Sequence, residues 1–272
     1  MKIINVGNFR EVTDPVQTEE MIHIQLVRES SEIPADYTYV AMPLAWSINH
    51  HGAQQTQKQI DEVCRDNPDE KLFFVCQHIL VNRLTFHGNL VFTPHATVLD
   101  SFIPIPHYSC TYNQRWARPW EEREYTFSFM GSFHTHPVRR KLYEHFKNRK
   151  DCLVIDTGPW HFESSHQKQQ ENSQKYIEIM GNTKYSLCPR GSGPSTIRIW
   201  ESMAMGSKPV ILSDFLQMPL DREFHASWAR MPENFDTSMM DGIASHAAPY
   251  SNEHYFQMFS NNNLYKSILR EL

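Results

Sequence analysis

A loop of small residues in the C-terminal half of the chain is flanked by two arginines and a glutamate. The stretch reads CPRGSGPSTIRIWES, with Arg190 before the loop and Arg198 and Glu201 after it. Its glycines, which tolerate positive φ, predict a tight turn, and Pro194 and Ser195 predict the start of a helix. A helix N-terminus and two guanidinium groups attract phosphate oxygens. The stretch therefore predicts a diphosphate site, with the carboxylate one turn further on accepting hydrogen bonds from ribose hydroxyls.

Spacing alone leaves a plainer interpretation open, in which these residues form a turn and a surface Arg198–Glu201 ion pair worth about 0.3 kcal/mol. Other phosphate-binding loops fit less well. The pattern GxxxxGK[ST] is absent from the chain, which disfavours an ATPase. GSGPST lacks the third glycine of a dinucleotide-binding loop and follows a late strand, which disfavours NAD.

Apolar runs of strand length alternate with helical patterns along most of the chain. Such alternation is typical of parallel sheets with crossover helices, and a second series begins after a polar, tryptophan-containing segment at 112–124. The strand candidates are 2–9, 37–44, 71–77, 89–94, 96–106, 125–131, 151–158, 184–189 and 208–214, and the helix candidates are 53–66, 137–149, 174–183 and 195–206. We therefore predict an α/β protein with an N-terminal lobe (1–118) and a second lobe (119–250). The C-terminal helix, in residues 251–272, would pack back on the first lobe.

The overall composition excludes several classes of protein. A formal net charge of -5 and a pI of about 6.3 provide no broad basic surface for nucleic acid. Five scattered cysteines without a CxxC pair favour free thiols in a reducing compartment. No stretch approaches the ~20 apolar residues of a membrane span, and the first apolar run is too short for a signal peptide. We expect a soluble, cytoplasmic protein without a nucleic-acid partner or a membrane span.

Two segments resemble the exostosin-like glycosyltransferases (family 47). The stretch 176–220, YIEIMGNTKYSLCPRGSGPSTIRIWESMAMGSKPVILSDFLQMPL, is similar to the core pattern of that family. FSFMGSFHTHPVRRKLYEHF (127–146) is similar to its preceding strand and helix, and EKLFFVCQH and TVLDSFIPIP resemble it more faintly. The chain departs from the family in its shorter length, in Ser207 and Lys208 before Pro209, and in the expected lack of a membrane anchor. The first lobe is the part that the resemblance covers least.

The resemblance implies two Rossmann-like lobes that face each other across a cleft, the GT-B architecture. The second lobe would hold a UDP-sugar donor (xylose, galactose, arabinose or glucuronic acid). Transfer to the hydroxyl of an oligosaccharide or glycan acceptor would invert the anomeric carbon, and no cofactor is implied. Carried over residue by residue, the nucleotide-sugar contacts are Gly131, Ser132, Arg139, Thr157, Arg190, Gly193, Ser195, Thr196 and Arg198, with Glu201 at the ribose. Arg140 is the alternative to Arg139 as a further phosphate contact.

Inverting transfer needs a general base that takes the proton of the attacking hydroxyl. Such a group belongs at the carboxyl end of a strand in the first lobe, and His78 directly follows the apolar run KLFFVCQ. Asp69, in the loop before that strand, is the second candidate, and His50, His51 and His87 compete with both. A structural or surface role is the alternative for each of them.

The stretch FHTHP places His134 and His136 one residue apart just after a strand, as in the HxH pair of many metallohydrolases. Two histidines need at least one or two further ligands, and the candidates, His161 and His166, lie in polar surroundings. A metal-dependent hydrolase is therefore the alternative enzyme, and a non-catalytic carbohydrate-binding relative is a third interpretation. Because the chain has no DxD pair and arginines can neutralise a diphosphate, we predict a metal-independent enzyme.

Overall fold

The computed structural model describes residues 2–7, 9, 16–158, 166–245 and 249–272. The chain divides into two compact units, each with its own five-stranded parallel sheet and flanking helices, which confirms the predicted α/β class. The first unit contains Met1–Tyr108, Phe215–Asp221 and Met258–Leu272, and the second contains Ser109–Asp214 and Arg222–Gln257. Residues 109–118, assigned to the first lobe from the sequence, therefore belong to the second unit.

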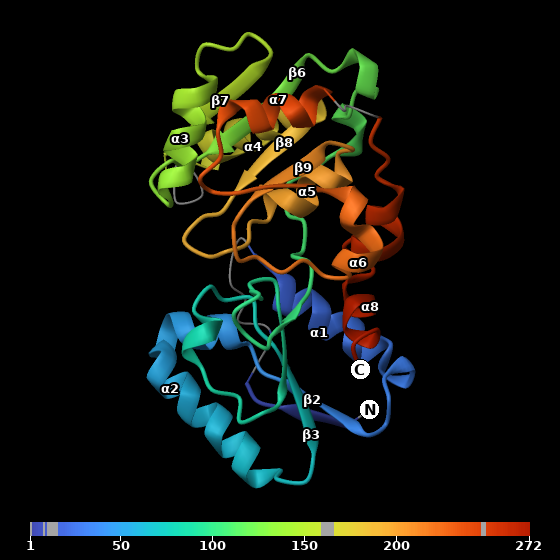
Figure 1. Cartoon of the computed structure of the whole chain (residues 1–272). Helices are drawn as coiled ribbons and strands as arrows, with labels where there is room; N and C mark the ends of the chain where they lie inside the picture. Colours follow the sequence, from blue (N-terminus) through green and yellow to red (C-terminus); the bar gives the residue numbers. More distant parts are fainter. Residues whose placement is uncertain (1, 8, 10–15, 159–165, 246–248) are drawn as a thin grey trace. The chain divides into compact units, whose positions relative to one another are not determined.

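The sheet of the first unit follows the order of the sequence (Figure 1), and its neighbouring strands are parallel. Strand alternation sends Tyr39 and Phe73 to the face covered by helices α1 (Thr18–Arg28) and α8 (Leu264–Leu269). The opposite face packs against α2 (Leu44–Asp66), which is bent at Gly52. The strands are β1 (Lys2–Asn5), β2 (Tyr37–Ala41), β3 (Lys71–Val75), β4 (Leu90–Thr93) and β5 (Ile103–Pro104).

The sheet of the second unit has the order β10-β9-β8-β6-β7, again with parallel neighbours. One face packs against α3 (Pro137–Phe146) and α7 (Thr237–Ser245), and the other against α4 (His166–Gly181) and α5 (Arg198–Ala204). The strands are β6 (Tyr125–Gly131), β7 (Cys152–Asp156), β8 (Thr183–Pro189), β9 (Lys208–Leu212) and β10 (Ala229–Met231). Because β7 and β8 lie on opposite sides of β6, the sheet has a topological switch point between β6 and β8.

The segment that opens the second unit is fixed by a buried arginine. Arg123 donates to the carbonyls of Arg118, Thr183 and Met205, so the tryptophan-containing stretch is part of this unit. The remaining elements are α6 (Asp221–Phe224) and the short turns η1 (Ser30–Glu32), η2 (Val81–Arg83), η3 (Gln114–Trp116), η4 (Trp120–Glu122), η6 (His225–Ser227) and η7 (Tyr255–Phe259). Within the described part of the chain, no helix combines the length and the apolar character needed to cross a membrane.

Several predicted elements differ from the structure. Helix α2 begins at Leu44 and not at residue 53, and α4 begins at His166 and not at residue 174. The strand expected over 96–106 is reduced to β5, because Asp100 accepts hydrogen bonds from Thr97 and Phe102 and holds the chain in a turn. The helix expected from Ser195 begins only at Arg198, the first residue of α5.

Candidate functional site

Three arginines gather at the switch point of the second sheet. β6 ends at Gly131 and β8 at Pro189, so the loops that follow these strands leave the same edge of the sheet. Arg139 comes from α3, Arg190 directly follows β8, and Arg198 begins α5. In an open parallel sheet, ligands bind in the crevice at the carboxyl ends of the strands where the order reverses. The topology therefore brings the predicted phosphate-binding cations to the expected ligand position.

Arg139 ties the two sides of this crevice together. Its Nε donates to the carbonyl of Arg190 (2.9 Å), Nη1 to that of Ser132 (3.0 Å) and Nη2 to that of Pro189 (3.3 Å). Burial lowers the pKa of Arg139 to about 10, and the positive charge of Arg198 acts in the same direction. Two neighbouring guanidinium groups in a partly buried place repel each other, and a bound anion would relieve this repulsion.

Arg198 is held between two aromatic rings. Its guanidinium carbon lies 4.7 Å from the centre of the Phe129 ring and 4.6 Å from that of the Tyr176 ring, and its Nη2 donates to the carbonyl of Met130. The guanidinium of Arg139 also lies against Phe129, at 5.4 Å. Cation–π contacts of this kind fix the plane of the guanidinium group. The orientation of Arg198 is thus set before any ligand arrives.

Two glycines let the backbone approach these arginines closely. A Cβ atom on Gly131 would lie 3.3 Å from Nη2 of Arg198, and one on Gly191 would lie 3.1 Å from Nη2 of Arg139. Gly191 was expected to supply a positive φ, but its φ lies outside that region. Close packing against Arg139, not backbone conformation, explains the glycine at this position.

The predicted helix N-terminus does not form where it was expected. Pro194 and Ser195 lie in the loop, and Ile197 is the N-cap of α5 without a side-chain capping bond. The helix has 7 residues, and its side chains Ile199 to Ala204 are buried all round. The arginine side chains, and not a helix end, are therefore the groups that can bind an anion here.

Glu201 is buried and bonded within the protein. It is only 4% exposed, and its carboxylate accepts hydrogen bonds from the hydroxyl of Tyr176 (2.6 Å) and the backbone N–H of Thr111 (2.7 Å). Burial raises its pKa, although these two hydrogen bonds act in the opposite direction. The predicted contact of Glu201 with ribose remains a prediction, since both carboxylate oxygens already have partners.

The other predicted contact residues lie on the loops around the arginines. Ser132 supplies the carbonyl that Arg139 binds, and its Oγ accepts from the N–H of His134. Asp156, at the end of β7, accepts from the N–H groups of Phe133 and Gly158 and so fixes the loop after β6. Thr157 follows it directly, and Gly193, Ser195 and Thr196 lie in the loop between β8 and α5.

An acidic residue that was not predicted from the sequence balances part of this charge. Glu233, just after β10, has carboxylate oxygens 3.6 Å from Nη1 of Arg190 and 3.6 Å from Nε2 of His136. Its N–H donates to Asp214, whose own N–H donates back to Glu233. The sequence analysis gave no signal for Glu233, because the three-residue strand β10 that precedes it was not among the predicted strands.

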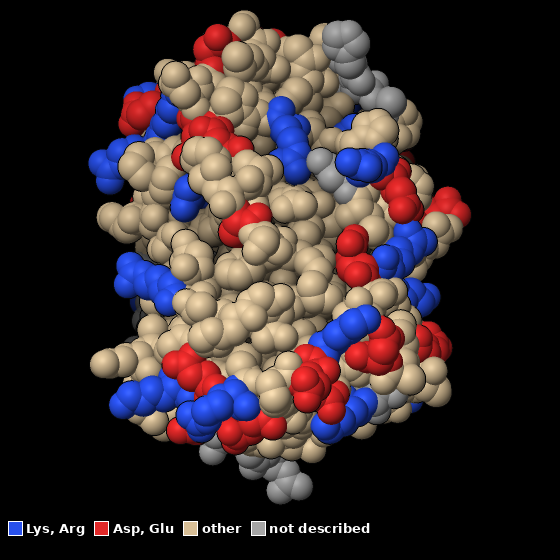
Figure 2. Space-filling model, turned by 60° about the horizontal axis from the view of Figure 1, so that its bottom comes forward, with Lys and Arg blue, Asp and Glu red and all other residues tan. Residues whose placement is uncertain are grey.

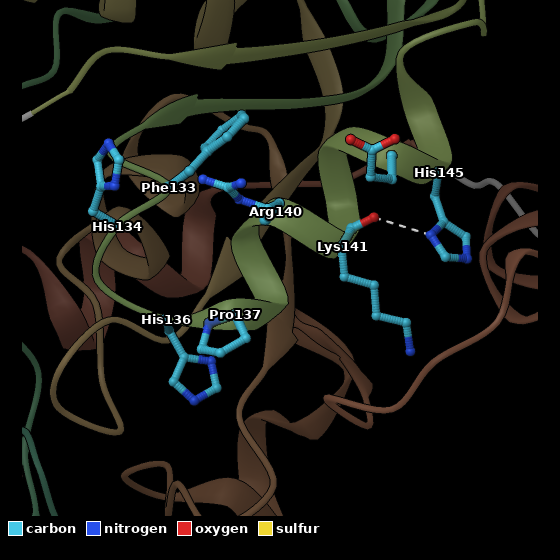
Figure 3. Close-up of a pocket in the computed structure, with 8 residues that line it drawn as sticks. Phe133, His134, His136, Pro137, Arg140, Lys141 and His145 are labelled. Atoms are coloured by element: carbon cyan, nitrogen blue, oxygen red, sulfur yellow. Dashed lines mark hydrogen bonds between the residues drawn. The ribbon is translucent and has the colours of Figure 1, made fainter.

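The HxH pair has a structural role in the loop before α3. Nδ1 of His136 accepts from the N–H of Val138 and caps the helix, and burial lowers the pKa of His136. His134 is exposed, and Figure 3 shows the two imidazoles pointing in different directions. His161 lies outside the described residues, and so does the side chain of His166. Among the described residues, no three His, Cys, Asp or Glu side chains are placed to hold a metal ion.

A hollow of about 590 Å³ lies beside this pair, along the outer side of α3. Its lining is Phe133, His134, His136, Pro137, Arg140, Lys141, Glu144 and His145. Basic and acidic side chains also alternate over the face that Figure 2 shows, where the coloured residues form no large patch of one sign.

The two predicted general bases lie at opposite ends of β3. His78 follows the carboxyl end, whereas Asp69 precedes the amino end and is exposed. A strand of five residues spans roughly 16 Å, so they cannot serve one site. Nδ1 of His78 accepts from the N–H of Leu80 (3.1 Å), which assigns the proton to Nε2, 3.0 Å from Oδ1 of Asn49. Burial lowers the pKa of His78, so the ring is neutral near pH 7.

The competing histidines are engaged elsewhere. Nδ1 of His50 lies 2.9 Å from the carbonyl of Trp46, and its ring stacks on the indole. His51 meets the same indole edge-on. His87 lies at the amino end of β4 and pairs with Asp61 at 2.8 Å.

A group of buried titratable residues at the carboxyl ends of the first sheet was missed from the sequence. Glu19 accepts from the N–H groups of Ala45 and Gln77, and burial raises its pKa to about 8. The rings of His95 and His107 meet edge-on at 5.2 Å. Burial lowers the pKa of His95 to about 4, and it holds the pKa of His107 well below the ordinary value of a histidine. The available signal was that both histidines directly follow apolar strand segments.

Two parallel sheets with flanking helices, and three arginines at the switch point of the second sheet, define the protein as a member of the α/β class. The Exostosin GT47 domain model matches residues 63–231, more than half of the chain, and the protein belongs to this glycosyltransferase family. This result confirms the resemblance seen in the sequence.

Individual relatives are distant. The chain is 25% identical over 140 residues to an exostosin-1 homolog of Caenorhabditis elegans (45% of this chain, 37% of that protein). It is 29% identical over 94 residues to ribitol-5-phosphate xylosyltransferase 1 of Danio rerio (34% and 21%). It is 23% identical over 167 residues to the probable glucuronoxylan glucuronosyltransferase IRX7 of Arabidopsis thaliana (54% and 36%). The chain thus spans between 21% and 37% of the length of these relatives.

Among solved structures, the chain is similar to one from a GtfA/B complex, with a TM-score of 0.39 and 11% identity. The likeness covers 94% of this chain and 60% of that one.

Proposed function

We propose that the protein transfers a sugar from a UDP-sugar to a carbohydrate hydroxyl, with inversion at the anomeric carbon. The observation that carries this proposal is the set of three arginines at the switch point of the second sheet. A leaving UDP develops negative charge on its phosphate oxygens, and fixed guanidinium groups stabilise that charge without a protonated acid. The family membership supports transferase chemistry at this place.

The donor sugar belongs to the group named for the resemblance, xylose, galactose, arabinose or glucuronic acid. The names of two relatives, a xylosyltransferase and a probable glucuronosyltransferase, support xylose and glucuronic acid. We also propose that transfer is independent of a metal ion, because the arginines provide the positive charge that a metal would otherwise supply. The acceptor would bind at the first unit, whose carboxyl edge carries neutral histidines suited to hydroxyl groups.

Calorimetric titration with UDP tests the diphosphate site directly. A charged hydrogen bond contributes roughly 1.5–3 kcal/mol, so Arg190→Ala and Arg198→Ala should each weaken UDP binding about 10- to 150-fold. Arg140→Ala is the matched control, because Arg140 is exposed on α3 and lines the outer hollow. Its affinity should stay within about twofold of the wild type, since the proposed phosphate contact is that of Arg139 instead. Equal UDP affinity in all three variants would overturn the assignment.

A further inference from the structure

A chain of contacts links Glu201 to the guanidinium of Arg198 through Tyr176. The hydroxyl of Tyr176, on α4, donates to Glu201 at 2.6 Å, and the ring of the same tyrosine lies 4.6 Å from the guanidinium carbon. Tyr176 and Glu201 are both 4% exposed. The carboxylate therefore touches the tyrosine, and the tyrosine touches the arginine.

This arrangement leaves each group little freedom. One Glu201 oxygen accepts from the tyrosine hydroxyl, and the other from the N–H of Thr111, so the carboxylate is held at both ends. A bonded hydroxyl fixes the rotation of the Tyr176 ring, which forms one wall of the sandwich around Arg198. Phe129 forms the other wall. An arginine side chain otherwise samples many rotamers, and holding one of them in advance favours binding.

We propose that Glu201 is a positioning residue, which acts through Tyr176 to hold the Arg198 guanidinium in the plane that meets the donor pyrophosphate. This inference rests on the proposed function and refines it. In this role Glu201 does not touch the ligand, in agreement with its burial. The role differs from the ribose contact that was expected from the sequence.

A ligand without ribose distinguishes the positioning role of Glu201 from a ribose contact. Inorganic pyrophosphate and UDP would be titrated into the wild type, Glu201→Gln and Tyr176→Phe in a calorimeter, without metal. A positioning role predicts that each variant loses affinity for both ligands by the same factor, about 3- to 10-fold. The amide oxygen in Glu201→Gln can accept only one of the two hydrogen bonds that the carboxylate accepts from Tyr176 and Thr111, whereas Tyr176→Phe removes the hydroxyl that donates one of them. Loss of UDP affinity with unchanged pyrophosphate affinity in Glu201→Gln would overturn the inference in favour of the ribose contact.

A matched control separates positioning from general destabilisation. Tyr255→Phe removes another buried tyrosine hydroxyl of the second unit, one that donates to Ser109 at 2.9 Å. Its thermal stability should fall about as much as that of Tyr176→Phe, while its pyrophosphate affinity stays at the wild-type value. Equal affinities in the two tyrosine variants would leave Tyr176 a merely structural residue and refute the inference.

Measurements in the Arg198→Ala variant distinguish the positioning role of Glu201 from the proposed diphosphate site. In Arg198→Ala, adding Glu201→Gln should cause no further loss of pyrophosphate affinity, because the group to be positioned is gone. An additive loss would refute the positioning role alone. If Arg198→Ala itself binds UDP and pyrophosphate like the wild type, the proposed diphosphate site fails and the inference fails with it.

Discussion

The carboxyl edges of the two sheets are built from opposite chemistry. In the second unit, Arg139, Arg190 and Arg198 carry permanent charge at the end of the sheet. In the first unit, the corresponding edge holds groups whose pKa values are moved towards the neutral form, such as Glu19 and His95. One edge is suited to binding an anion, and the other to contacting hydroxyl groups and protons. The two steps of a sugar transfer, holding a leaving diphosphate and taking up a proton, need these two kinds of group.

Topology explains much of this contrast. The order of the second sheet reverses between β6 and β8, so the loops after these strands diverge and leave a crevice for charged side chains. The first sheet follows the sequence without reversal, and the segments after its strands pack against one another. There the polar side chains are buried: Glu19 is 5% exposed and His107 is 3% exposed. Burial without a counter-charge favours the neutral form of each group.

The largest effect is expected on turnover. His78→Ala should lower kcat by about 10²–10⁴, the usual contribution of a general base, with little change in the KM for the UDP-sugar. To act as this base, Nδ1 of His78 must first release the N–H of Leu80, from which it accepts a hydrogen bond. Asp69→Asn should leave kcat near the wild-type value, because Asp69 is exposed at the amino end of β3. Initial rates at saturating donor measure both variants.

The variants His78→Ala and Asp69→Asn can also contradict the proposed contrast between the two sheet edges. If Asp69→Asn loses activity and His78→Ala keeps it, the proton is taken up away from the carboxyl edge of the first sheet. The functional contrast between the two edges would then be wrong. UDP binding, measured in parallel, should be unchanged in both variants, since both residues lie in the first unit.

The second prediction concerns the stability of the first unit and pH. The folded pKa of Glu19 is raised from 4.5 to about 8, so between these values the folded state holds a proton that the unfolded state has released. The stabilisation is therefore complete below about pH 4.5 and falls as pH rises towards 8, by roughly 1.4 kcal/mol per pH unit. Glu19→Gln keeps the shape of the neutral acid but cannot titrate.

Denaturant unfolding at several pH values measures this slope. The advantage of the wild type over Glu19→Gln should shrink by roughly 4 kcal/mol between pH 5 and 8, while other titrating groups cancel in the difference. Glu70→Gln is a useful control, because Glu70 is only partly buried and its hydrogen bond with Lys2 lowers its pKa. A difference for Glu19→Gln that does not change with pH would mean that this carboxyl is charged, and the contrast with the arginine edge would weaken.

The sequence predicted the elements with strong patterns and missed what depends on tertiary packing. Apolar runs located both sheets, and loop composition located Arg190 and Arg198. The burial of Glu201 could not be foreseen, because its partners Tyr176 and Thr111 are 25 and 90 residues away in the chain. The same reason hid Glu19, whose acidic side chain looks like an ordinary first-turn residue of a helix.

The start of α5 shows how a local rule loses to tertiary contacts. Pro194 and Ser195 fit a helix start by every local rule, yet the helix begins at Arg198. The side chain of Arg198, the first residue of the helix, donates to the carbonyl of Met130 and lies against the rings of Phe129 and Tyr176. Propensity rules describe isolated segments and contain no such contact.

The smallest effect on UDP binding is expected for a substitution at Gly131, which lies close to the side chains of Phe129 and Arg198. Ala at this position would place its Cβ 3.1 Å from Cζ of Phe129 and 3.3 Å from Nη2 of Arg198. Phe129 is buried and the guanidinium of Arg198 is held against it, so the stability cost should be about 1–3 kcal/mol. Because one of the two neighbours is Arg198, UDP affinity should fall by about two- to fivefold, the equivalent of less than 1 kcal/mol.

Gly242→Ala is the matched control for this change. Gly242 lies in α7, and a Cβ there would meet no atom within 4 Å, so the variant should be slightly more stable and bind UDP like the wild type. If Gly131→Ala also binds UDP like the wild type while losing stability, Arg198 tolerates displacement. The preset guanidinium geometry would then matter less than the charge itself. A loss of affinity in Gly131→Ala alone would show that the anion edge depends on geometry as well as charge.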